Sequence, residues 1–120
     1  MGEWGSSTVE VAIATVLVVT LLLAVVQLGV YFHARSVAAT AARQGLDTAR
    51  GSEGTAAAGD QVATQFLNEA GGALVGESAS VSRTPTEVTV TVSGSALSVL
   101  PGVSLPVTVT VRAPVERVVE

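Results

Sequence analysis

The stretch VAIATVLVVTLLLAVVQLGVYFHA, residues 11–34, decides the fold of this chain of 120 residues. It contains no Asp, Glu, Lys or Arg. As an α-helix it is roughly 36 Å long, which is enough to cross the hydrocarbon core of a bilayer, about 30 Å thick. The alternative is a helix buried in a soluble core, but such helices are usually shorter, and the remaining residues are too few to cover this one on all sides. The sequence therefore predicts a single membrane-spanning helix.

Composition excludes several classes of partner and site. The net charge of −4 argues against nucleic acid as a partner, because phosphate binding needs a basic surface. Cys is absent, which excludes disulfides and thiolate ligands, and His33 is the single His. A metal site would need mainly carboxylates, and no acidic cluster at a suitable spacing occurs. We expect neither a metal ion nor a cofactor.

Nothing in the sequence indicates catalysis. Ser and Thr are abundant, but the single His lies at the end of the apolar run, away from any nucleophile paired with an acid or base. The Gly residues are scattered, and none forms a phosphate-binding loop after a strand. We expect no enzyme, no catalytic residue and no small-molecule substrate.

Small polar residues precede the apolar run. Ser6, Ser7 or Thr8 can cap the first free N–H groups of the helix, and Glu10 complements the positive end of its dipole. Helix capping alone would explain these residues.

A second interpretation rests on spacing. Gly5 stands five residues before Glu10 at the start of an apolar helix, which resembles the processing site of type IV pilins and pseudopilins. The longer pattern G-S-x-x-V-E-x-A, here residues 5–12, resembles the TadE-like pilus assembly proteins. That family also has a long N-terminal helix, a short helical stretch and a Val/Thr-rich β region with an L-P-G loop, here residues 100–102. The resemblance implies that a prepilin peptidase cuts between Gly5 and Ser6 and removes residues 1–5 as a leader.

The resemblance also gives Glu10 a role. A carboxylate at the edge of a hydrocarbon core is costly unless it is paired. Among packed helices of this kind, the amino terminus of a neighbouring subunit can pair with it, so that Glu10 sets the register between subunits. A helix cap with no further role is the alternative.

Polar residues within the apolar run are few. Gln27 and Gly29 favour close packing and hydrogen bonding between transmembrane helices, although substitutions tolerated in a long helix explain them equally well. Tyr31, Phe32 and His33 are typical of an anchor at the membrane interface.

Beyond Arg35 the helical period continues. An apolar stripe at spacings of three and four residues predicts that the helix extends to about Ala49, and residues 51–54 break it. Residues 56–74 predict a second amphipathic helix. The stripe of the first helix consists of Val37, Ala38, Ala41, Ala42, Gly45, Leu46 and Ala49.

The period then changes to two. Residues 80–83 predict a short strand, and residues 87–93 and 105–112 alternate between Val and Thr. The two longer runs predict an antiparallel pair with one dry face, and Pro114 ends the sheet. The fold class is therefore α+β, with a small antiparallel sheet of about three strands. We divide the chain into a leader (1–5), a transmembrane and amphipathic helix (6–50) and a small α+β domain (51–120).

These observations give an expected function. The resemblance implies a pilin-like subunit, or a minor or accessory component, of a tight-adherence pilus or a related secretion system. Its partners are the lipid bilayer, a prepilin peptidase and other pilin or Tad-system subunits. An unprocessed single-pass protein whose domain binds an envelope partner is the alternative.

Two arguments about orientation disagree. Arg35, Arg43 and Arg50 follow the apolar run, so the positive-inside rule favours a cytoplasmic C-terminal domain. The resemblance implies the opposite, and we follow it: we expect a single-pass protein of the cell membrane with an extracytoplasmic domain.

Overall fold

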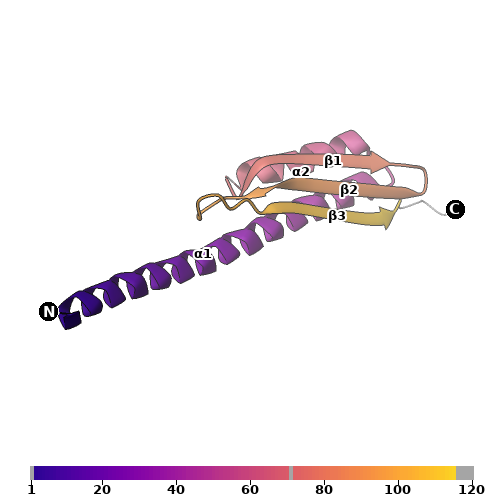
Figure 1. Ribbon diagram of the computed structural model, residues 1–120. Coiled ribbons are helices and arrows are strands. Elements are labelled where there is room, and N and C mark those ends of the chain that lie inside the picture. The colour runs from indigo at the N-terminus through magenta and orange to yellow at the C-terminus, as the bar shows by residue number, and fades with distance from the viewer. Residues whose placement is uncertain (1, 71, 116–120) are drawn as a thin grey trace.

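The chain forms two helices followed by a three-stranded sheet (Figure 1). The computed structural model describes the backbone of residues 2–70 and 72–115, and the side chains of these residues from Ser7 onward. The elements are α1 (Gly2–Arg50), α2 (Ala56–Glu69), β1 (Leu74–Arg83), β2 (Glu87–Ala96) and β3 (Pro106–Pro114). The predicted α+β fold is confirmed.

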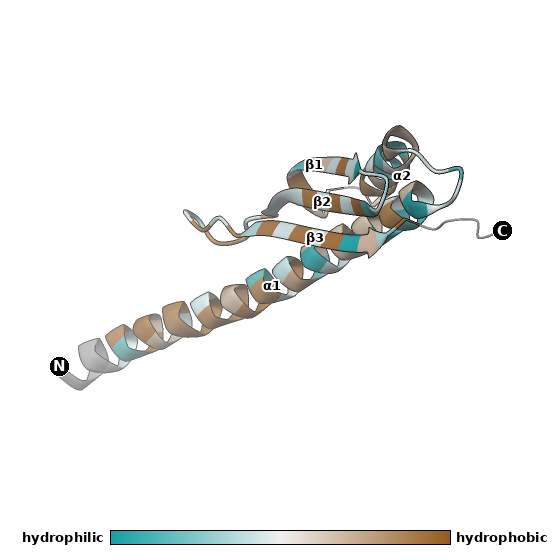
Figure 2. Cartoon of the chain, turned by 90° about the vertical axis from the view of Figure 1, so that its right-hand side faces the viewer, coloured by the Kyte–Doolittle hydropathy of each residue, from teal (hydrophilic) through white to brown (hydrophobic). Residues whose placement is uncertain are grey.

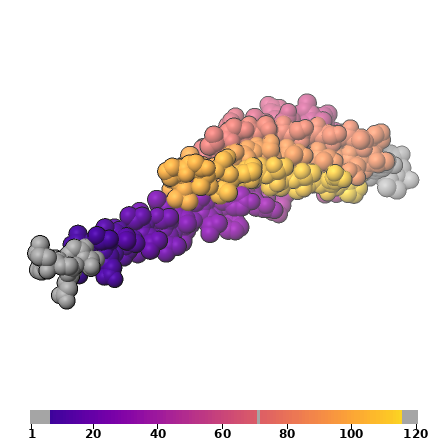
Figure 3. Space-filling view, in the orientation of Figure 1, coloured from indigo at the N-terminus to yellow at the C-terminus, as the bar shows by residue number. Residues whose placement is uncertain are grey.

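Helix α1 is continuous over 49 residues and makes the molecule a rod 89 Å long and 21 Å wide. Its first half projects alone, whereas its second half lies against the sheet (Figures 1 and 3). We call residues 7–26 the free half and residues 27–50 the packed half. The head is the unit formed by the packed half, α2 and the sheet.

The core of the head lies between the packed half and the sheet. Side chains on one stripe of α1 are buried, as the sequence predicted, and Arg35, Arg43 and Asp47 on the other side are exposed. Most of the buried residues of α1 are Ala, so the backbone of α1 comes close to the sheet, and Val side chains fill the space between them. The fully buried members are Ala34, Ala38, Ala41, Ala42 and Ala49 from α1, with Val88, Val90 and Val92 from β2.

The sheet is an antiparallel meander in the order β1-β2-β3. Apart from Val75, its Val residues face the helices, and Ser and Thr face away from them; the alternation is visible as coloured bands in Figure 2. Hydroxyl pairs cross the outer face between Ser78 and Ser93 (3.0 Å) and between Thr91 and Thr110 (3.3 Å). One face is therefore dry, as predicted.

Two glycines bring α1 and α2 together. A Cβ added to Gly59 would lie 2.7 Å from the carbonyl oxygen of Gly45, and one added to Gly45 would lie 3.0 Å from the carbonyl oxygen of Gly59. Backbone therefore packs on backbone at this crossing. Thr55 caps α2 by accepting a hydrogen bond from the N–H of Ala58 (3.0 Å).

Arg83 closes the far end of α1. Its Nη1 donates to the carbonyl oxygens of Ala49 (2.6 Å), Gly51 (3.1 Å) and Gly54. The last carbonyls of a helix have no partner within it and carry partial negative charge. The guanidinium therefore satisfies the end of α1 and ties it to β1.

Two predicted boundaries are wrong, and a glycine-containing bulge explains the second of them. The second helix ends at Glu69 and not at residue 74, and the first strand begins at Leu74 and not at residue 80. Between Val75 and Ser78 the register shifts by an extra residue at Gly76, whose φ is +63°. A bulge of this kind reverses which face the following side chains point to, so the alternation of β1 is broken in the sequence.

Candidate membrane anchor and its junction with the head

The free half of α1 exposes apolar side chains all around the helix. Its large exposed aliphatic side chains retain between 47% and 66% of their accessible surface. They are Val9, Val11, Ile13, Val16, Leu17, Val18, Val19, Leu21, Leu22, Val25 and Val26. About 20 residues of helix are roughly 30 Å long, which matches the thickness of a hydrocarbon core. Within the described residues, α1 is long and apolar enough to cross a membrane.

The polar groups of the free half are arranged for an apolar medium. Thr15 and Thr20 donate their hydroxyls to the carbonyl oxygens of Val11 (2.8 Å) and Val16 (2.7 Å), one turn earlier. Glu10 is exposed, one turn from the start of the free half. It is the single charged residue between Ser7 and Ala34.

The alternative of helix capping by Ser7 or Thr8 does not hold in the full chain, since the helix begins at Gly2 and passes through both residues. The backbone of Gly5 and Ser6 belongs to this helix, and their side chains lie outside the described residues. The processing site stays a prediction.

The predicted span and the free half end at different residues. The apolar run of the sequence extends to Ala34, but Gln27 is 3% exposed and Ala34 is fully buried. The head therefore covers one side of the last eight residues of the run, whereas Leu28 and Phe32 on the other side stay exposed. Exposure of α1 on all sides ends at Leu22, since Leu23 and Ala24 are half-covered, and Val25 and Val26 are the last exposed residues before Gln27.

Gln27 joins the helix to the loop between β2 and β3. Its Nε2 donates to the carbonyl oxygen of Leu97 (3.0 Å), and its Oε1 accepts from the N–H groups of Val99 (2.7 Å) and Leu100 (3.3 Å). The sequence suggested bonds from Gln27 to another helix, but within this chain its amide is occupied by the loop. Packing at Gly29 against a second helix stays a prediction.

The loop, residues 97–105, is built around a tight turn. The N–H of Val103 donates to the carbonyl oxygen of Leu100 (3.3 Å), and Gly102 has φ +75°. Pro at the second position and Gly with positive φ at the third are the residues that a type II turn requires. The L-P-G motif is thus the tip of this loop, and Figure 1 shows the tip reaching past the ends of the strands toward the free half.

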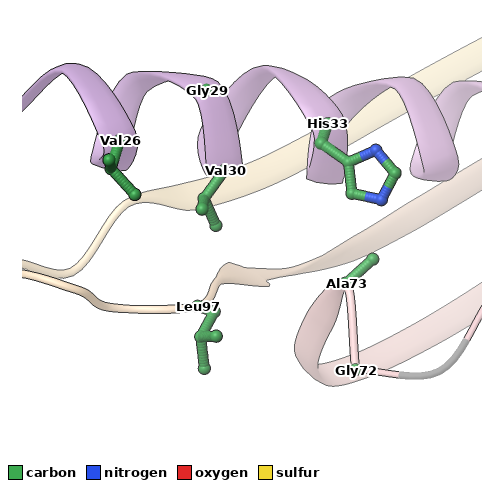
Figure 4. Close-up of a pocket in the computed structure, with 7 residues that line it drawn as sticks. All are labelled: Val26, Gly29, Val30, His33, Gly72, Ala73 and Leu97. Atoms are coloured by element: carbon green, nitrogen blue, oxygen red, sulfur yellow. The ribbon is translucent and has the colours of Figure 1, made fainter.

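A shallow apolar groove of about 480 Å³ opens beside this junction (Figure 4). Val26 and Val30 point from α1 toward the chain segment that carries Leu97, and Ala73 points back toward the helix. Gly29 leaves open space, because no atom lies within 4 Å of an added Cβ. The lining residues are Val26, Gly29, Val30, His33, Gly72, Ala73 and Leu97.

The aromatic residues predicted to anchor the helix lie one turn beyond Gln27. The rings of Tyr31 and Phe32 are 5.5 Å apart, Tyr31 is half-buried against the core, and Phe32 and His33 are exposed. Among the described residues, no group of three or more His, Cys, Asp or Glu side chains is placed to hold a metal ion.

The comparison with protein families finds a match for most of α1. Residues 5–47 match the family model described as TadE-like protein. This segment is TadE-like. The match covers about a third of the chain and includes Gly5, Glu10, the free half and most of the packed half. It confirms the predicted relation to TadE-like pilus assembly proteins. Neither the curated proteins nor the solved structures gave a match.

The TadE-like match and the apolar helix together indicate a protein related to Tad pili and associated with a membrane. The β2–β3 loop lies outside the matched segment, but Gln27, which bonds to it, lies inside the segment. The matched segment therefore carries the residue that holds the β2–β3 loop.

Proposed function

We propose that this chain is a pilin-like subunit, or a minor or accessory component, of a Tad-type pilus or a related secretion system. The free half of α1 anchors it in the cell membrane in a single pass, and the head lies on the extracytoplasmic side. Its role is assembly and contact, without catalysis. The observation that carries this proposal is the TadE-like match at residues 5–47, which coincides with the exposed apolar helix.

The proposed processing fits the position of the site. Gly5 and Ser6 belong to the N-terminal end of α1, which projects away from the sheet (Figure 1). A peptidase that works at the membrane surface can reach this end without moving the head. Cleavage after Gly5 leaves Ser6 as the new amino terminus, and Glu10 becomes the fifth residue.

Glu10 then sets the register between subunits. It is an exposed carboxylate on a helix whose other exposed side chains in the free half are uncharged. In hydrocarbon such a group is costly, and the amine of a neighbour's Ser6 removes that cost when the two helices are aligned. The same amine does not exist at this position in the uncleaved chain. Processing and register are therefore coupled.

The test is the mature amino terminus of the protein isolated from the membrane of its native host. Intact mass and amino-terminal sequencing are expected to give a chain that begins at Ser6. Gly5→Leu should abolish this cleavage, because the residue before the cut must be small. Gly2→Leu makes the same change within the leader and should leave cleavage after Gly5 intact.

An intact MGEWG terminus in a host with an active prepilin peptidase would contradict processing. The protein would then be an unprocessed single-pass protein whose head binds an envelope partner. A second test uses Glu10→Val, which should leave processing intact. This variant should reduce co-isolation of the protein with other pilus subunits by roughly tenfold or more, because an unpaired amine costs several kcal/mol in an apolar medium.

A further inference from the structure

We propose that the β2–β3 loop, residues 97–105, is a second membrane contact: it rests in the headgroup layer and its apolar side chains reach the edge of the hydrocarbon. The inference rests on the proposed anchoring of the free half. Its partner is the lipid bilayer itself. The contact makes the head sit directly on the membrane.

The first argument is the level at which the loop is held. The free half spans about 30 Å, so the turn after it lies where the hydrocarbon meets the headgroups. Gln27 is in that turn, and three hydrogen bonds fasten it to Leu97, Val99 and Leu100. The loop therefore lies at the same depth. Leu23 and Ala24, one turn deeper, are half-covered.

The second argument is the composition of the loop. Its sequence LSVLPGVSL has five aliphatic residues and no charge, and Leu97 is 51% exposed. This exposed surface is continuous with the apolar surface of the free half through Val26 and the groove. Exposed apolar patches on an otherwise soluble surface mark interaction sites. Here the surface that it continues is the one proposed to contact lipid.

The third argument is that several polar groups of the loop have partners within the protein. The Ser98 hydroxyl lies 2.7 Å from the carbonyl oxygens of both Leu100 and Val103. The carbonyl oxygen of Leu105 accepts from Ala96, and Gln27 bonds the backbone of three further residues. A backbone with internal partners can approach hydrocarbon at low cost, because little hydration is lost.

The opposite end of the same sheet provides the contrast. The β1–β2 turn, residues 84–86, reads Thr-Pro-Thr and is flanked by Arg83 and Glu87. Thr84 and Thr86 are exposed hydroxyls, and the turn lies far from the free half (Figure 1). Both connections contain Pro, yet the connection beside the anchor is apolar and the remote one is polar. A general need for tight turns does not explain this difference, whereas contact with a membrane does.

Because the chain has no Cys, single-Cys variants allow a direct test. The full chain is reconstituted in bilayers of phosphatidylethanolamine and phosphatidylglycerol and spin-labelled at Leu97→Cys or Pro101→Cys. Pro85→Cys is the matched control in the remote turn, and Val18→Cys reports on the free half. Collision with oxygen, which concentrates in hydrocarbon, is compared with collision with a water-soluble nickel complex.

We expect the oxygen-to-nickel ratio at Leu97 and Pro101 to exceed that at Pro85 several-fold and to lie below that at Val18. Loop labels that behave like Pro85, with Val18 in hydrocarbon, would overturn the membrane contact and leave the anchor intact. Loop labels shielded from both reagents would also overturn it, because another protein chain would then cover the loop. If Val18 itself collides mainly with nickel, the proposed anchor fails first.

Discussion

Both halves of α1 place apolar side chains against a neighbour, but the side chains differ in size. Both lie on one unbroken helix and both are largely apolar, but the free half carries Val and Leu on all sides, whereas the packed half carries Ala on one stripe and charges on the other. Large side chains suit a fluid partner that fills any gap, and Ala suits a sheet whose backbone must come close. The size of the side chains along α1 thus indicates which neighbour each half has, a fluid medium for the free half and the sheet for the packed half.

The largest expected effect comes from charge in the free half. Val18→Arg together with Leu22→Arg should cost about 5–7 kcal/mol of insertion free energy, from about 2.5–3.5 kcal/mol for each Arg near the bilayer centre. The measurement is the fraction of full-length protein that resists alkaline extraction from membranes. Ser36→Arg with Gln44→Arg places the same charges on exposed positions of the packed half and should change nothing. If the two double variants resisted extraction equally, the free half would not be the part of the chain that contacts the membrane.

An intermediate effect is expected from added volume. Ala38 is fully buried between α1 and the sheet, so Ala38→Leu should destabilise the head by about 1–3 kcal/mol through overpacking. Thermal unfolding of the full chain in detergent micelles, followed by circular dichroism, measures this change. Ala14→Leu makes the same substitution in the free half, where Ala14 is exposed, and should leave the transition unchanged.

The smallest effect concerns the residue at the boundary between the halves. Gln27→Leu removes the partner of two N–H groups and one carbonyl in the loop, which should lower the free energy of local loop opening by about 1–2 kcal/mol. Hydrogen exchange of the loop amides should accelerate roughly tenfold, while that of β2 stays the same. Gln61→Leu, on the exposed face of α2, is the control. Unchanged exchange in the loop would mean that the three hydrogen bonds do not hold it.

Much of the architecture could be predicted from periodicity. The stripe of α1 and the Val/Thr alternation of β2 and β3 are local patterns, and the structure confirms the faces they predicted. β1 was predicted too short because the bulge at Gly76 interrupts its alternation. The resemblance of residues 5–12 to TadE-like proteins needed only a short motif, and the family match confirms it.

The junction could not be predicted in the same way. Gln27 and its loop partners are separated by 70 or more residues, and the partners are backbone groups, which leave no side-chain signature. The same holds for Arg83, whose three acceptors are backbone carbonyls at the end of α1 and in the connection that follows it. For Gln27, a polar side chain in an apolar run was the signal that a partner exists, whereas Arg83 stands between Ser82 and Thr84 and gave no such signal. The identity of that partner depended on the tertiary fold.

The continuity of α1 has a mechanical consequence. The helix contains no Pro and runs without interruption from the proposed anchor to the clamp at Arg83, so the head has no joint with which to turn on its own. The packed half is a lever arm roughly 36 Å long. If the anchor tilts by about 20°, an ordinary value for a membrane helix, Arg50 swings sideways by about 12 Å. A sideways force on the head therefore exerts a torque on the anchor in the bilayer. Conversely, a tilt of the anchor displaces the far end of α1.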